Sequence, residues 1–197
     1  MRRLRPPMLR AGTWLAAVAA VAVLAILGFS NLTELTTRVR GSILPVEIAA
    51  QLVTGITAVV AAFHLSLPDR PARWALLPLP SLAVWIGSTG YSCWRHWIVF
   101  GPDGRALGEA AECFRFLVAV GIPLAIGLLI PLRRARPLSP VRVAIVGGLG
   151  VGALGAFLLQ FFHPFDVTFI DFAGQLVAIG LVMAGITAVE GLAARRN

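Results

Sequence analysis

Long apolar stretches alternate with short polar segments along almost the whole chain. A helix of about 20 residues, rising 1.5 Å per residue, crosses the hydrocarbon core of a bilayer, so each long uncharged stretch is a candidate membrane span. The pattern predicts an all-α fold, a single domain over residues 1–197 that forms an integral membrane bundle of six transmembrane helices. The expected spans are residues 13–30, 43–65, 74–91, 114–132, 141–162 and 167–192.

The first expected span follows a basic N-terminal segment, a combination that secretory signal peptides also show. Its apolar part is long for a signal peptide, and five further stretches follow, so we expect a retained first helix. The connections are short except for residues 92–113, which contain the turn sequence Gly101-Pro102-Asp103-Gly104. No segment is large enough for a separate soluble domain.

Composition supports a membrane protein, because 58% of the residues are hydrophobic and only 13% are charged. An average soluble domain carries roughly a quarter charged residues. The basic residues are all arginines, as expected from a GC-rich bacterial genome, and the net charge is +8. These arginines lie at the ends of apolar stretches and not in one stripe with interleaved aromatic residues. We therefore expect the lipid bilayer as a partner and no direct contact with nucleic acid.

The arginines also predict an orientation. With the N-terminus inside, twelve of the 17 arginines fall on the inner side and five on the outer side. The positive-inside rule then predicts a multi-pass protein of the bacterial inner membrane with both termini in the cytoplasm. Residues 92–113 would face the periplasm. At the outer interface, an aromatic belt would form from Tyr91, Trp94, Trp97 and Phe100, with stacking on a ligand as the alternative role.

The two cysteines are the most informative candidates for chemistry. Cys93 and Cys113 lie at the outer ends of the third and fourth expected spans. If those helices pack side by side, the two sulfurs can meet, and a disulfide is plausible in an oxidising compartment. The pair could be a simple staple of the loop, a thiol pair that responds to oxidation or metal, or two inert thiols.

Two thiolates bind soft metals well, and two histidines could add ligands to the cysteines. His96 follows Cys93 by three residues, and His163 lies near the outer end of the fifth span. The candidate metal set is therefore Cys93, Cys113, His96 and His163. Cys-x-x-His alone is a weak signal, however, and the spacing of a four-ligand zinc site is absent. We expect no resident cofactor, only a transient heavy-metal ion.

Polar residues mark one face of two spans. Glu47, Gln51 and Thr54 lie at helical spacing in the second span, and Asp171 and Gln175 do so in the sixth. Ionisable groups in a span face the bundle interior or water. The simplest expectation is interhelical hydrogen bonding near the outer end of the bundle; a proton or ion path is the alternative.

Gly150, Gly152 and Gly155 match the dinucleotide-binding pattern G-x-G-x-x-G, but that site needs a βαβ unit, which this chain does not offer. Gly148 and Gly152 also lie four residues apart, a spacing that lets membrane helices approach closely. We therefore predict helix packing. Because the chain also has no nucleophile elbow, P-loop or His-Glu-x-x-His, we expect no enzyme. The alternatives are a membrane thiol oxidoreductase, which would need a second cysteine pair or a quinone, and a small transporter.

Several short motifs occur at the ends of the expected helices. In order, they are Arg2-Arg3-Leu4-Arg5-Pro6-Pro7, Phe63-x-Leu65-x-Leu67-Pro68 with Trp74, Gly90-Tyr91-x-Cys93 with Trp97, Gly101-Pro102-Asp103-Gly104, Cys113, Arg133-Arg134-x-Arg136-Pro137 and His163-Pro164-x-Asp166. Together they resemble the NrsF family of six-span bacterial membrane proteins, over nearly the whole chain.

The resemblance implies a negative regulator, an anti-sigma factor that holds an extracytoplasmic-function sigma factor at the inner membrane and releases it under heavy-metal or oxidative stress. It also implies that Cys93 and Cys113 are the sensing pair. The partner-binding patch would then be Arg2, Arg3, Arg5, Arg10, Arg133, Arg134 and Arg136, which equally serve as the orientation signal. Relatives usually carry a further cytoplasmic segment before the Arg-Pro stretch. If that segment contacts the sigma factor, this chain is expected to bind weakly, or its start codon was placed too late.

Overall fold

The computed structural model describes residues 6–30, 32–39, 42–101, 106–135, 139–162 and 169–194. Every regular element in these residues is a helix, which confirms the all-α prediction. The elements are α1 (Pro7–Phe29), α2 (Leu32–Val39), α3 (Leu44–Leu65), a 3₁₀ turn η1 (Ala72–Leu76), α4 (Leu79–Phe100), α5 (Ala106–Arg133), α6 (Pro140–Phe162) and α7 (Phe169–Ala194).

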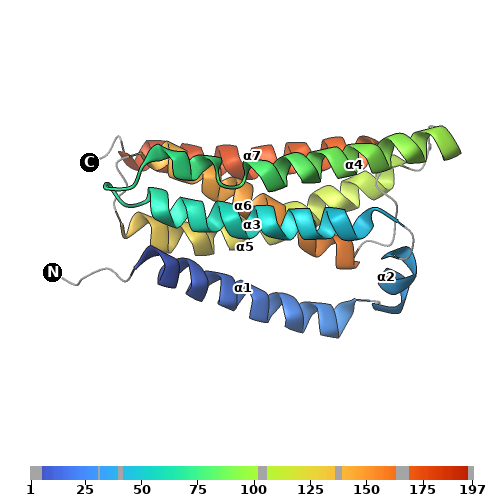
Figure 1. Cartoon of the computed structure of the whole chain (residues 1–197), viewed down its shortest axis with the longest axis horizontal. Helices are drawn as coiled ribbons and strands as arrows, with labels where there is room; N and C mark the ends of the chain where they lie inside the picture. The colour runs from blue at the N-terminus through green and yellow to red at the C-terminus, as the bar shows by residue number, and fades with distance from the viewer. Residues whose placement is uncertain are drawn as a thin grey trace.

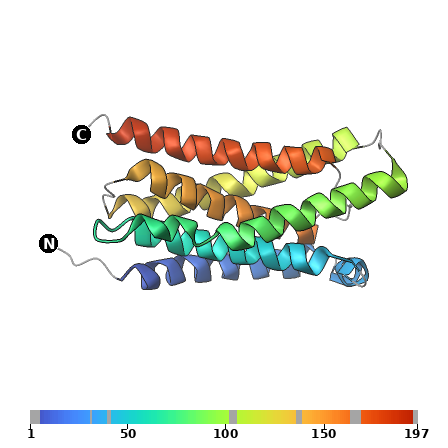
Figure 2. The same cartoon turned by 45° about the horizontal axis from the view of Figure 1, so that its top comes forward.

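The six long helices lie side by side and alternate in direction, while the short α2 lies across one end (Figure 1). Helix α1 begins, and α7 ends, at the same end of the bundle. We call this the arginine end, because Arg10 lies there in the first turn of α1, Arg133 ends α5, and Arg142 lies in the first turn of α6. The other end, which is nearer to Cys93 and Cys113, is the cysteine end. Figure 2 shows that α4 reaches furthest beyond the bundle at the cysteine end.

Within the described residues, four helices are long and apolar enough to cross a membrane, and they are Pro7–Phe29, Leu44–Leu65, Ala111–Arg133 and Pro140–Phe162. The prediction of six is wrong by two, the third and sixth expected spans. Helix α4 has the length, but Ser88, Thr89, Ser92 and Arg95 lower its hydropathy. In α7, the apolar stretch is the shorter Phe172–Gly185.

The expected long connection at residues 92–113 is also wrong. Helix α4 continues to Phe100, and α5 already begins at Ala106, so Cys93 and Cys113 lie inside helices. The reason is that falling hydropathy marks the edge of the apolar layer, whereas the helical hydrogen bonds continue beyond it. Gly101 ends α4 with a φ of 74°, a left-handed conformation that glycine adopts without strain.

Helix α6 occupies the centre of the bundle, where it packs on α3, α5 and α7. Its glycines allow this close approach. A Cβ placed on Gly150 would lie 3.1 Å from the backbone nitrogen of Val59 in α3, and one on Gly148 would lie 3.0 Å from the Cα of Met183 in α7. The G-x-G-x-x-G pattern is therefore a helix-packing surface, as predicted.

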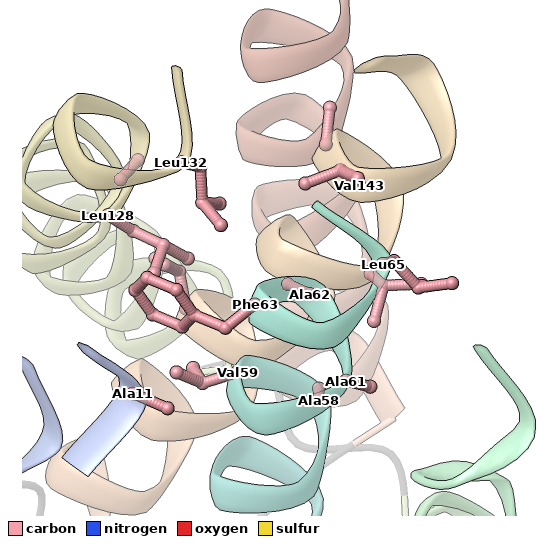
Figure 3. Close-up of a cluster of buried hydrophobic side chains, with 14 of the residues drawn as sticks. Ala11, Ala58, Val59, Ala61, Ala62, Phe63, Leu65, Leu128, Leu132 and Val143 are labelled. Carbon is pink, nitrogen blue, oxygen red and sulfur yellow. The ribbon is translucent and has the colours of Figure 1, made fainter. Parts of the chain in front are cut away.

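At the arginine end, a cluster of buried side chains joins α1, α3, α5 and α6 (Figure 3). Phe63 of α3 is fully buried and lies beside Leu128 and Leu132 of α5. Ala11 brings the first turns of α1 against the same cluster, although most of α1 is exposed on the outside of the bundle. The start of α1 and the end of α5 are therefore held together through α3.

Candidate functional site

Three polar side chains of α3 point into the bundle at successive turns. Glu47 is 1% exposed, and Gln51 and Thr54 are fully buried, so the predicted shared face exists. Thr54 lies at the middle of this 22-residue helix. The polar face of α3 therefore extends deeper into the bundle than the predicted position near its outer end. Burial of such groups in a membrane bundle is costly unless they have hydrogen-bond partners.

Helix α4 supplies the facing side of this polar region. The hydroxyl of Ser92 donates a hydrogen bond to Oε1 of Glu47, which confirms the predicted interhelical hydrogen bonding. Because α3 and α4 run antiparallel, this bond sets their register. Gln51 lies level with Ser88 and Thr89, and Thr54 lies level with Trp85, all of which are buried.

Helix α7 reaches the same depth with Gln175. Its Ile179 faces Gly152 of α6, and Gln175 lies one turn further towards the cysteine end, where it is 3% exposed. The side chain of Asp171, its expected neighbour on this face, lies outside the described residues. We call the region lined by Glu47, Gln51, Thr54, Trp85, Ser88, Thr89, Ser92 and Gln175 the polar seam.

Several atoms of the polar seam lack a hydrogen-bond partner among the described residues. They are Oε1 and Nε2 of Gln51, the hydroxyls of Thr54 and Thr89, Nε1 of Trp85 and Oε1 of Gln175. An unpaired polar group in an apolar interior costs about 1–3 kcal/mol. This concentration of donors and acceptors marks the polar seam as a candidate binding site, which the sequence could show only for the polar faces of α3 and α7.

Both cysteines are buried thiols, Cys93 in α4 at 1% exposed and Cys113 in α5 at 6% exposed. Cys113 packs in an apolar cluster with Leu117, Leu159 of α6 and Ile179 of α7. The extensive contacts of α4 in the described structure are with α3 and α7, and those of α5 are with α7 and α6. The described structure thus shows no extensive packing of α4 on α5, and the pairing of the two sulfurs stays a prediction.

The expected metal set is only partly within the described structure. His96 is half-buried on α4, one turn beyond Cys93, whereas His163 lies outside the described residues. Over the described part of the chain, no three His, Cys, Asp or Glu side chains gather in a group that could hold a metal ion. The four-residue set remains a prediction, because His163 is one of its members.

At the arginine end, Arg10 joins α1 to the rest of the bundle. Its Nη2 donates to the carbonyl oxygen of Pro131, in the last turn of α5, and its guanidinium lies 5.2 Å from the centre of the Phe63 ring. The last carbonyls of a helix have no partner within the helix, and a cation is favoured there by the helix dipole. Arg10 is therefore a structural contact between helices, in addition to its predicted place in the basic patch.

The remaining arginines of the predicted patch are divided by what the structure describes. Arg133 and Arg134 are exposed at the end of α5, and Arg70, Arg73 and Arg142 add exposed positive charge at the same end. Arg2, Arg3, Arg5 and Arg136 lie outside the described residues. At the cysteine end, the described arginine side chains are Arg95 and Arg115. The described arginine side chains are therefore more numerous at the arginine end, and which end faces the cytoplasm stays a prediction.

The family described as NrsF, negative regulator of sigma F, matches residues 1–188. The chain belongs to the NrsF family. No curated protein and no solved structure matches the chain. The family name describes negative regulators of a sigma factor, so membership supports a sigma factor as the partner.

In this NrsF member, His64 and Trp74 form a contact that the sequence did not indicate. His64 is 5% exposed, and its ring stacks on Trp74 of η1 with 3.9 Å between the centroids and 4° between the planes. This stack holds the turn after α3 against the end of that helix. The spacing of ten residues has no helical periodicity, so no sequence pattern predicted it.

Proposed function

We propose that this NrsF-family chain holds an extracytoplasmic-function sigma factor at the cytoplasmic face of a bacterial inner membrane, and releases it when a stress signal acts at the cysteine end. The family match over residues 1–188 is the observation that supports a sigma factor as the partner. The arginine end is the proposed docking face, because exposed arginines gather there and the positive-inside rule directs them to the cytoplasm.

The proposed signal acts on the thiols of Cys93 and Cys113. A soft metal ion would displace two protons and bind two thiolates. Alternatively, an oxidant would take up two electrons and two protons as a disulfide forms. Both thiols are buried, so either reaction requires α4 or α5 to move. Metal binding or oxidation shifts the equilibrium between two arrangements of α4 and α5 only if its free energy differs between those two arrangements.

The polar seam connects this chemistry to the rest of the bundle. Cys93 directly follows Ser92, whose hydroxyl is bonded to Glu47 of α3. At its other end, the same helix carries Phe63, which is packed against α5 and lies beneath the guanidinium of Arg10. A displacement of α4 at Cys93 therefore acts on α3, and α3 contacts the helices that form the arginine end.

Two sets of variants test the two ends separately. In a strain that carries the chain and its sigma factor, the double variant Cys93→Ser with Cys113→Ser is expected to keep the sigma regulon silent under metal or oxidative stress. Deletion of the gene is expected to switch the regulon on without stress. Transcript profiling measures both. An unchanged profile after deletion refutes the anti-sigma function for this chain, whereas a stress response that survives the double Ser variant refutes only the cysteine sensor.

The docking face is tested with purified protein. Arg133→Gln with Arg134→Gln is expected to weaken capture of the sigma factor, and the effect should be largest at low salt, because exposed charges are screened. The matched control is Arg95→Gln with Arg115→Gln, which removes the same charge from the opposite end. Equal loss of binding in both pairs would mean that net charge, and not the arginine end, attracts the partner.

A further inference from the structure

The connection between α3 and α4 is anchored at both ends and exposed in the middle. At its start, Ser66 is fully buried, and its hydroxyl donates a hydrogen bond to the carbonyl oxygen of Phe63. At its end, Pro78 is fully buried just before α4 begins. Between these two anchors, every residue from 68 to 73 is exposed. We call residues 68–73, which include Arg70 and Arg73, the α3–α4 turn.

The backbone of the α3–α4 turn has little conformational freedom. Trp74 follows the turn directly, and its ring is stacked on His64 of α3. The backbone amide of Trp74 also donates a hydrogen bond to the carbonyl oxygen of Pro71. The rings of Pro68 and Pro71 fix two further backbone dihedrals. The two arginines are therefore presented on an ordered backbone, which reduces the entropy lost when a partner binds.

Further positive charge adjoins the α3–α4 turn. Trp74 packs on the apolar cluster at the arginine end that includes Val143 of α6 (Figure 3). Arg73 directly precedes Trp74, and Arg142 directly precedes Val143, and both arginines are exposed. Asp69 offsets one of the positive charges of the turn, and Arg142 restores it. The turn and the start of α6 therefore bring exposed positive charge to one buried cluster.

From this arrangement, we propose that the α3–α4 turn binds an acidic segment of the sigma factor. The proposal rests on the proposed function, and it adds the element of the arginine end that recognises the partner and the chemistry of the partner's surface. A guanidinium group pairs with a carboxylate through two parallel hydrogen bonds. One exposed ion pair contributes little to affinity, so the binding depends on several arginines held by an ordered backbone.

Charge reversal in the strain that carries the chain tests the proposal. Arg70→Glu with Arg73→Glu is expected to raise the regulon transcripts of unstressed cells by about tenfold or more, because like charges repel. An immunoblot of the membrane fraction should show the wild-type amount of this variant. The matched control, Arg95→Glu with Arg115→Glu, reverses two exposed charges at the cysteine end and should leave the regulon silent.

Suppressor mutations then identify what the α3–α4 turn contacts. Mutants that restore silence to the Glu pair are selected, and those whose sigma factor no longer drives the regulon in the deletion strain are discarded. Replacements of Asp or Glu by Lys or Arg in the sigma factor are the expected result. Arginines also attract the phosphate groups of anionic lipids. Suppressors confined to lipid synthesis, or to the chain itself, therefore overturn the proposal.

The docking proposal and the proposed function fail in different ways. If deletion of the gene leaves the regulon unchanged, the anti-sigma function fails, and the docking proposal fails with it. If deletion switches the regulon on but the Glu pair, present at the wild-type amount, keeps it silent, only the docking proposal is overturned. If the Glu pair does not accumulate in the membrane, Arg70→Gln with Arg73→Gln decides in the same way.

Discussion

The close contact between α3 and α6 predicts that a single methyl group at Gly150 destabilises the bundle. The Cβ of an alanine at this position would lie 2.9 Å from Cγ2 of Val59 and 3.1 Å from its backbone nitrogen. Ordinary carbon contacts are about 3.5–4.0 Å. Because the second of these atoms belongs to the backbone of α3, a change of rotamer cannot relieve the contact, and the two helices have to separate.

Two opposing terms determine the magnitude. Alanine favours a helix over glycine by about 1 kcal/mol, and overpacking a well-filled interior costs typically about 1–3 kcal/mol. The obstruction is backbone, so we take the upper part of that range and expect Gly150→Ala to lower the free energy of unfolding by about 1–2 kcal/mol. Gly180→Ala on α7 is the control, because a Cβ there meets no atom within 4 Å. It should raise the free energy of unfolding by about 0.5–1 kcal/mol.

Reversible unfolding in mixed micelles of a mild detergent and increasing dodecyl sulfate measures both values. Each variant adds one methyl group to the wild-type chain at a helical glycine, so the comparison isolates the effect of the surroundings of that methyl group. Equal shifts for Gly150→Ala and Gly180→Ala would show that α3 and α6 are not in close contact, and would refute the central position of α6.

Three further predictions concern the two ends of the bundle. Arg10→Ala should lower the free energy of unfolding by about 1–3 kcal/mol in the same assay, because the last turn of α5 loses its donor, whereas Arg142→Ala, at an exposed position, should change it by less than about 0.5 kcal/mol. Ser92→Ala should cost about 1–3 kcal/mol, because Glu47 loses a hydrogen bond in a buried place; no change would contradict that bond. The thiol of Cys93 should react with a maleimide far more slowly in the folded than in the unfolded protein, and equal rates would contradict its burial.

The sequence predicted the helical class and the second and fifth spans closely, because long uncharged stretches have few structural alternatives in a bilayer. It was less successful where polarity changes along a helix. The predicted third span stopped at residue 91, but α4 continues for a further nine residues to Phe100. Hydropathy reports the chemistry of the surroundings, and a helix that leaves the apolar layer does not end there.

The candidate site was predictable only in part, for a related reason. Helical spacing correctly placed Glu47, Gln51 and Thr54 on one face. Ser92, which bonds to Glu47 of that face, lies on another helix, and nothing in the local pattern of α4 identifies which residue of α3 it will meet. That register follows from tertiary packing, including the contacts of Gly55 and Gly150 that position α3 on α6.

The two interfaces of α3 differ in chemistry, and this difference bears on how a signal can act. Towards α6, the contact is made by glycines whose missing side chains let the backbones approach, so a displacement there meets steric resistance at once. Towards α4, the contact includes the hydrogen bond that Ser92 donates to Glu47, beside the buried side chains of Ser88 and Thr89. Hydrogen bonds between flexible side chains can be exchanged at small cost when new partners are available. In the proposed function, α4 is therefore the helix that a reaction at Cys93 would displace, while α3, α6 and α7 remain packed.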